Sequence, residues 1–193
     1  SAIAVKWFES HLNESLLEIN DHFSKFRISD ALMSCYKLVW DDFCSWYLEI
    51  VKPSQQQAMD TATHTATLDF FERLLKILHP FTPFITEEIG HLLRSLPLAP
   101  SERRVERKKY DCIMTSAQPT IGQVDKQLIS DFSKAVDVIT AVRTFRKENN
   151  IPNRDMLNVY FKNQQSPIGE MDAVVTKLCN LGEFSMQSKP MQP

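Results

Sequence analysis

Helical periodicity is the feature that most restricts the fold of this chain. Apolar residues recur every three or four positions from Val5 to Phe26, and the same spacing resumes from Leu32 to Ile50. Such spacing is typical of helices that bury one stripe of side chains. Ser29 is suited to cap the second helix and Pro53 to end it. The sequence therefore predicts two long antiparallel helices joined by a short turn.

The rest of the chain continues this pattern and then changes its period. Helical spacing predicts three further helices, over residues 59–78, 83–93 and 125–149. After Pro152, apolar residues alternate with polar ones at Leu157, Val159 and Phe161, which indicates a strand. A short helix over 168–178 and a strand around 184–186 are expected to follow.

These elements predict a mainly α fold, a helical bundle with a small C-terminal α/β appendage. Residues 1–96 are expected to form a four-helix part of the bundle, and 97–124 a loop or linker that contains the charged run 102–109. Residues 125–152 are expected to supply the fifth helix of the bundle. Residues 153–193 are expected to form a truncated strand–helix–strand appendage.

Composition excludes several classes of function. The chain has only four glycines, too scattered to form a phosphate-binding loop or a dinucleotide fingerprint. Its four cysteines form no Cys-x-x-Cys pair and its histidines no His-x-x-x-His pair, so we expect no metal site. No catalytic constellation is recognisable. There is no apolar run of membrane-spanning length and no leader-like segment, and the protein is expected in the cytoplasm with no membrane partner.

Basic residues gather at the end of the fifth predicted helix. Arg143, Arg146 and Lys147 are spaced to share one helix face, and Asn149 follows directly. Cations there also complement the helix dipole, which is a sufficient structural explanation. Basic and amide groups concentrated at a helix end also suit phosphate contacts. We expect Arg146 to be the exposed phosphate ligand, because Arg143 lies next to the apolar stripe.

Aromatic residues on the second predicted helix provide another candidate site. Trp40 and Tyr47 lie beside the main apolar stripe, so either ring could be presented to a nucleic-acid base or packed on a neighbouring helix. We take Trp40 as the candidate ring for stacking on a base. Arg27, between the first two predicted helices, is the remaining basic candidate.

Three separated segments resemble one known family. The segments WDDFCSWYLEIVKP (40–53) and LHPFTPFITEEI (78–89) resemble the helical anticodon-binding domain of class I aminoacyl-tRNA synthetases for branched aliphatic amino acids. The first segment is most similar to valyl-tRNA synthetases. The segment ITAVR (139–143) and the NIP (150–152) that follows it are also most similar to valyl-tRNA synthetases. The resemblance covers about residues 5–165.

The resemblance implies a tRNA-binding fragment of an ATP-dependent ligase. Its partners would be tRNA, with tRNA-Val expected, and the rest of the synthetase chain, not DNA. ATP and Mg²⁺ would serve the full-length enzyme, and this chain would hold no cofactor, metal or catalytic residue. An isoleucyl or leucyl enzyme, or a standalone helical module for protein interaction, are the alternatives.

Overall fold

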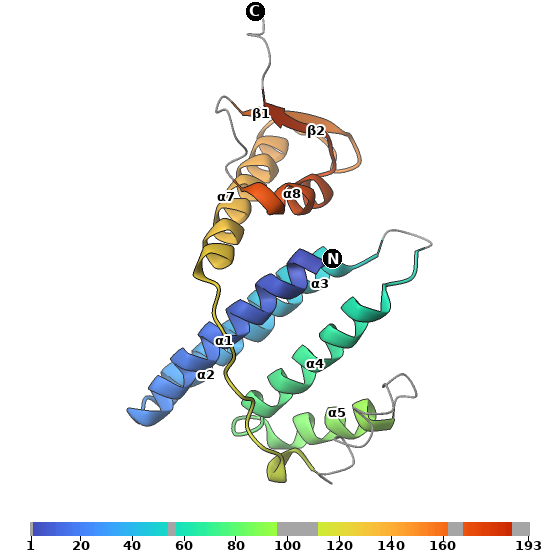
Figure 1. Ribbon diagram of the computed structural model, residues 1–193. Coiled ribbons are helices and arrows are strands. Elements are labelled where there is room, and N and C mark those ends of the chain that lie inside the picture. Colours follow the sequence, from blue (N-terminus) through green and yellow to red (C-terminus); the bar gives the residue numbers. More distant parts are fainter. Residues whose placement is uncertain (1, 54–56, 96–111, 162–167, 187–193) are drawn as a thin grey trace, which may run out of the picture. The chain divides into compact units, whose positions relative to one another are not determined.

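The computed structural model describes residues 2–53, 57–95, 112–161 and 168–186, and these residues are mainly helical (Figure 1). They belong to two compact units, residues 1–124 and 125–193. The mainly α fold with a small C-terminal α/β part is confirmed. The expected grouping of helix 125–152 with the preceding helices stays a prediction. The charged run 102–109 lies outside the described residues.

The first unit begins with two long helical segments that pack side by side. Helix α1 (Ala2–Ser24) contacts α2 (Ile28–Lys37) and the π-helix η1 (Leu38–Tyr47), which continues into α3 (Leu48–Val51). The π-helix ends with the backbone N–H of Leu48 donating to the carbonyl oxygen of Phe43, five residues back. Two helical segments over 5–26 and 32–50 were therefore predicted correctly, but not the π-helix within the second.

The π-helix moves the buried stripe of this second segment. Its buried positions step by five residues, from Leu38 to Phe43, and then continue to Tyr47. A regular 3.6-residue period instead placed Trp46 in the stripe and Tyr47 beside it, whereas Tyr47 is fully buried and Trp46 is half-buried. The same period placed Leu32 in the stripe, but this residue of α2 is 41% exposed, so that assignment was also wrong.

An aromatic cluster forms the centre of this unit. The ring of Phe8 on α1 lies 5.3 Å from Phe43, 4.9 Å from Tyr47 and 5.0 Å from Phe70, measured between centroids. Phe70 belongs to α4 (Thr61–Leu78), which begins where the Asp60 side chain accepts a 2.8 Å hydrogen bond from the Thr63 N–H. The cluster therefore joins three helical segments through edge and tilted ring contacts.

A second, smaller cluster joins α4 to the segment after α5 (Pro83–Ser95). Leu75, Leu93 and Ile113 are buried together, and Ile113 opens the 3₁₀ turn η2 (Ile113–Thr115). The Glu87 carboxylate accepts the Ile113 N–H at 2.8 and 3.0 Å. A side chain at Gly90 would approach the Ile113 Cδ1 to 2.7 Å, so glycine there lets the turn pack closely on α5. Part of the expected 97–124 linker is thus core.

The end of this unit is held by Asn13, which is 1% exposed on α1. Its carboxamide oxygen accepts the Gly122 N–H at 3.1 Å, and its nitrogen donates to the Gln123 carbonyl oxygen at 3.2 Å. The same oxygen accepts a 2.9 Å bond from Arg73 on α4. These bonds fix the backbone of residues 122–123 against α1.

The second unit combines one long helix with a small sheet. Helix α7 (Lys126–Glu148) packs on η3 (Gly169–Met171) and α8 (Asp172–Cys179). Strands β1 (Leu157–Phe161) and β2 (Leu181–Met186) pair in parallel, and α8 lies in the crossover connection that parallel neighbours need. The strands and short helix expected after Pro152 are confirmed.

Candidate nucleic-acid interface

Three of the predicted site residues are exposed at the C-terminal end of α7. Arg143 and Lys147 lie in its last turns, and Asn149 is the residue at its C-cap. The helix ends because Asn150 adopts a left-handed φ of +53°, with the Ile151 N–H donating to the Arg146 carbonyl oxygen at 2.9 Å. Cations at this position complement the partial negative charge of the helix end. Two positive side chains are therefore presented to solvent there.

Arg146 does not belong to this exposed group. Its side chain is buried, with the residue only 4% exposed, and its Nη1 donates to the Pro152 carbonyl oxygen at 2.9 Å. Its Nη2 donates to the carbonyl oxygens of Cys179 at 2.8 Å and Asn180 at 3.4 Å. The expectation that Arg146 is the exposed phosphate ligand was wrong, because backbone carbonyls after α7 and at the end of α8 accept hydrogen bonds from its guanidinium. We assign it a structural role.

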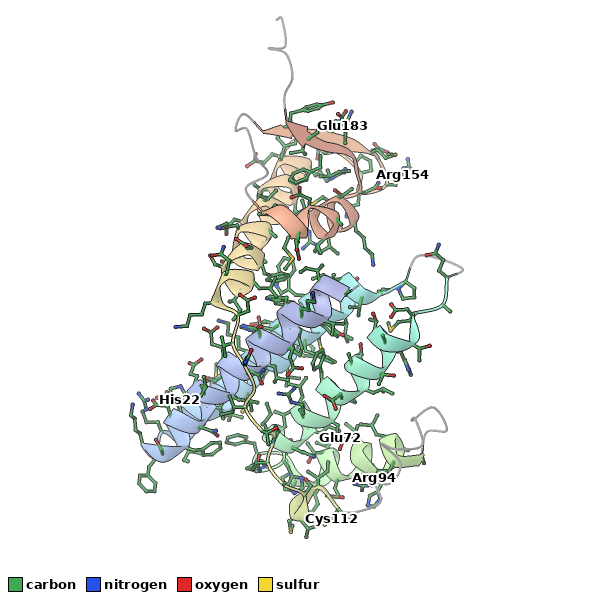
Figure 2. The ribbon with its side chains drawn as sticks, viewed as in Figure 1. His22, Glu72, Arg94, Cys112, Arg154 and Glu183 are labelled. Carbon is green, nitrogen blue, oxygen red and sulfur yellow. The ribbon has the colours of Figure 1, made fainter. Side chains whose placement is uncertain are left out.

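Arg143 and Asn149 have different local environments within the exposed group. Burial raises the pKa of the Cys179 thiol, and the charges of Arg143 and Arg146 lower it in part, which places Arg143 near the end of α8. The side-chain amide of Asn149 donates to the Phe145 carbonyl oxygen at 2.9 Å and so caps its own helix. Arg154 follows on the surface of this unit, as Figure 2 shows.

Arg27 lies in the first unit, immediately before α2. Its Nη2 is 2.7 Å from the Asp21 carboxylate, which also binds Lys25 at 2.7 Å. The hydrogen bond from Lys25 is the largest influence on Asp21 and lowers the pKa of that carboxyl. Two cations share this one carboxylate, and both are at least 44% exposed. Asp30 in the first turn of α2 supplies a second acidic side chain to this region.

Trp40 lies on the π-helix η1 and points to solvent. The side chain is 60% exposed, and its ring stacks on Tyr36 with 15° between the planes and 6.4 Å between centroids. Tyr47, the other candidate ring, is fully buried and bonds Thr67 through its hydroxyl at 2.8 Å. Of the two rings, only Trp40 is available to stack on an added base.

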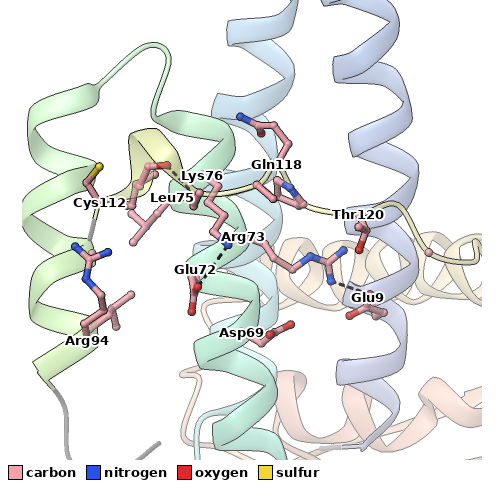
Figure 3. A pocket seen from close by; sticks show the side chains of 17 residues that line it. Glu9, Asp69, Glu72, Arg73, Leu75, Lys76, Arg94, Cys112, Gln118 and Thr120 are labelled. Carbon is pink, nitrogen blue, oxygen red and sulfur yellow. Dashed lines mark hydrogen bonds and ion pairs between the residues drawn. The ribbon is translucent and has the colours of Figure 1, made fainter. Parts of the chain in front are cut away.

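A pocket in the first unit is lined by charged side chains that pair with one another. It has a volume of about 560 Å³ between α4, α5 and residues 112–122 (Figure 3). Arg73 pairs with Glu9 at 2.7 Å, and Lys76 lies 3.5 Å from Glu72. This pairing leaves no surplus charge of either sign among those four side chains, so we do not take the pocket as the candidate site.

The residues that the structure describes contain no group of three or more histidine, cysteine, aspartate or glutamate side chains able to hold a metal ion. None of the helices described is long and apolar enough to cross a membrane.

Comparison with known proteins identifies the family. The protein-family model described as "Anticodon-binding domain of tRNA ligase" matches residues 5–161, which is most of the chain. The chain belongs to this family. The family resemblance carried by residues 40–53, 78–89 and 139–143 is therefore confirmed.

The relatives of this anticodon-binding domain are similar along nearly its whole length. Valine–tRNA ligase of Parabacteroides distasonis is 43% identical over 96% of the chain, and that of Porphyromonas gingivalis 41% over 94%. Valine–tRNA ligase of Bacillus cereus is 26% identical over the full chain. The chain spans 19–21% of the length of these three relatives.

Sequence reasoning missed an exposed row of side chains on the anticodon-binding domain. Ile28, Leu32, Tyr36 and Trp40 are each at least 41% exposed and are four residues apart along α2 and the start of η1. A spacing of four residues places side chains on one face of a helix. That spacing was visible in the sequence. The prediction assigned Leu32 to the core stripe and Tyr36 and Trp40 to an aromatic cluster. It assigned Ile28 to neither.

Proposed function

We propose that this chain is the tRNA-recognition part of a valine–tRNA ligase and binds the anticodon stem and loop of tRNA-Val. The observation that carries the proposal is the similarity of about 40% identity to valine–tRNA ligases over 94–96% of the chain. The anticodon-binding family by itself supports tRNA as the partner. The identity of the relatives supports valine rather than isoleucine or leucine.

Recognition of the tRNA in this proposal combines two kinds of contact, with phosphates and with a base. Arg143, Lys147 and Asn149 at the end of α7, together with Arg27, bind backbone phosphates, which position the RNA without reading its sequence. Trp40 offers a ring on which an unpaired base stacks, the usual way in which loops of RNA are recognised. We infer that base identity is read near Trp40 and that affinity comes mainly from the cations.

Catalysis in this proposal belongs to other parts of the enzyme. Those parts bind ATP, Mg²⁺ and valine, and they join to this chain in the full-length cytoplasmic ligase. The chain supplies no side chain to the reacting atoms. Its contribution is to hold the cognate tRNA so that the acceptor end reaches the distant active site.

Binding of the intact chain to three transcripts tests the proposal. We expect saturable binding of tRNA-Val, weaker binding of tRNA-Val with a replaced anticodon, and weaker binding of tRNA-Ile, measured by fluorescence anisotropy. Affinity for all three should fall steeply as salt is raised, because phosphate contacts release counterions. Equal affinity for the two versions of tRNA-Val would contradict anticodon recognition, and tighter binding of tRNA-Ile would contradict the assignment to valine.

A further inference from the structure

The turn between α1 and α2 contains a phenylalanine in an unfavourable backbone conformation. Helix α1 ends with the Phe26 N–H donating to the Phe23 carbonyl oxygen at 3.1 Å and the Arg27 N–H donating to the His22 carbonyl oxygen at 2.9 Å. This pair of bonds defines a Schellman motif, in which the penultimate residue takes a left-handed conformation. That residue is Phe26, with φ of +56°.

The choice of residue at this position is unusual within the molecule itself. Two other residues of the described part close helices with positive φ, and both are asparagines, Asn150 at +53° and Asn180 at +49°. Glycine and asparagine are the residues that tolerate this conformation, whereas a bulky side chain there is strained. Glycine or asparagine at position 26 would therefore adopt this backbone conformation with less strain than phenylalanine.

Packing of the Phe26 ring does not compensate for this backbone strain. The residue is 88% exposed, although the apolar spacing of the sequence placed it in the buried stripe of the first helix. The preceding aromatic residue, Phe23, is half-buried and stacks on Phe81 at 5.9 Å, so the end of α1 is anchored without Phe26. Strained residues that the fold does not require are concentrated at functional sites.

The neighbours of Phe26 favour RNA as the ligand over an apolar protein surface. Lys25 precedes the ring and Arg27 follows it, and both are exposed while sharing the single carboxylate of Asp21. An aromatic face beside cations is the arrangement that binds single-stranded nucleic acid, by stacking on a base while the cations meet phosphates. Desolvating two cations against an apolar protein partner would be unfavourable.

We propose that Phe26 is a base-stacking residue, held away from the helix bundle by its left-handed backbone and flanked by Lys25 and Arg27. Its ligand is an unpaired base of an RNA loop. The inference rests on the proposed function, since it adds a contact to the same tRNA, but it concerns a residue that neither sequence reasoning nor the family match selects. At 88% exposure, the ring is accessible to a base.

Two substitutions separate a binding role from a structural one. Phe26→Gly removes the ring and also relieves the strain, so the melting temperature should stay unchanged or rise while RNA affinity falls. A fall of about 5- to 100-fold is expected for the loss of one stacked base. Phe26→Trp should retain wild-type affinity. Phe84→Ala is the matched control, because Phe84 on α5 is 91% exposed and should not affect binding.

The probes are tRNA-Val and an RNA hairpin of its anticodon stem and loop carrying 2-aminopurine at successive loop positions. The wild-type chain should change the fluorescence of one position, and Phe26→Gly should abolish that change. Wild-type affinity of Phe26→Gly, or a drop of its melting temperature by about 5 °C or more, would overturn the role of Phe26 alone. Absence of binding by the wild-type chain would overturn the proposed function and this inference together.

Discussion

The Nη2 atom of Arg146 lies 2.8 Å from the carbonyl oxygen of Cys179, the last residue of α8. The other terminal nitrogen of the same guanidinium bonds Pro152, just beyond the end of α7. One buried charge therefore binds both the C-terminal end of α8, where a cation is electrostatically favoured, and the segment that follows α7. This side chain thus links α7, α8 and the backbone that leads to the sheet.

Arg146→Ala should destabilise the second unit. Its removal leaves three carbonyl oxygens without their charged donor and opens a cavity, so we expect a loss of about 3 kcal/mol or more in the free energy of unfolding. Urea denaturation measures this loss. Lys147→Ala, one residue along and exposed, should change stability by no more than about 0.5 kcal/mol. A loss below about 1 kcal/mol for Arg146→Ala would show that its bonds are dispensable.

Lys147→Ala should weaken tRNA binding to a similar extent for matched and mismatched anticodons. A lost phosphate contact reduces the slope of log affinity against log salt by about one unit. Lys134→Ala is the matched control on the same helix, because Lys134 lies outside the last turns of α7, where the proposed phosphate contacts are. Anisotropy titrations over a range of salt concentrations measure both slopes. Equal slopes for the Lys147 variant and the wild type would remove this residue from the interface.

Trp40→Ala should weaken binding without altering the salt slope. Loss of one base-stacking ring costs about 1–3 kcal/mol of binding free energy and releases no counterion. Trp40→Phe should recover part of the affinity. The fold should tolerate both changes, because the ring is 60% exposed and contacts Tyr36 on its own helical segment. If affinity and slope fall together, Trp40 acts by positioning a cation rather than by stacking.

Acid should selectively weaken the attachment of η2 to α5. Burial raises the pKa of Glu87, but the Ile113 N–H bonds and Arg94 outweigh it, so the pKa lies below its usual value. A carboxyl with a lowered folded-state pKa contributes stability that is complete above its unfolded pKa and is lost as pH falls through the folded one. The stability difference between wild type and Glu87→Gln should therefore be constant above about pH 5.5 and shrink in more acidic solution. Urea titrations at a series of pH values measure it, and a pH-independent difference would contradict this role.

The four cysteines should separate into two classes when the native chain reacts with Ellman's reagent at about pH 8. Cys44 is exposed and Cys112 half-buried, so both should react. Cys35 is buried, and burial raises its pKa to about 11, which leaves little thiolate to react. Cys179 is also buried with a raised pKa. Cys35 and Cys179 should react only as their own units unfold. Rapid native reaction of either would show that its unit opens locally.

Local features of the fold could be predicted because their causes are local. Asp60 and Asp125 accept N–H bonds three residues ahead, at 2.8 and 3.0 Å, and their positions near the predicted helix starts were readable from the sequence. The alternation at Leu157–Phe161 likewise marked a strand. Exposure of Lys147 followed from its place in the helical pattern.

The errors arose where a distant residue or an irregular helix decides the outcome. Two of the three carbonyl partners of Arg146 are 33 and 34 residues away and the third lies beyond the end of α7, so nothing in its own helix distinguishes it from exposed Arg143. The five-residue step from Leu38 to Phe43 contradicts the regular period on which pattern reading depends. Phe26 fits an apolar stripe by spacing, yet the helix ends at Ser24 before reaching it.

The hydrogen bonds between Asn13 and the backbone of residues 122–123 also determine when the first unit can complete its folding. These partners are 109 and 110 residues apart in sequence, so within the first unit they are among the last contacts that a growing polypeptide can make. During synthesis, α1 emerges before the rest of this unit, and the carboxamide of Asn13 has no partner at residues 122–123 until Gly122 and Gln123 leave the ribosome. A nascent chain halted before that point would bury this polar group without two of its bonds, and such chains should remain more open to proteases. Completion of the first unit thus coincides with the start of α7.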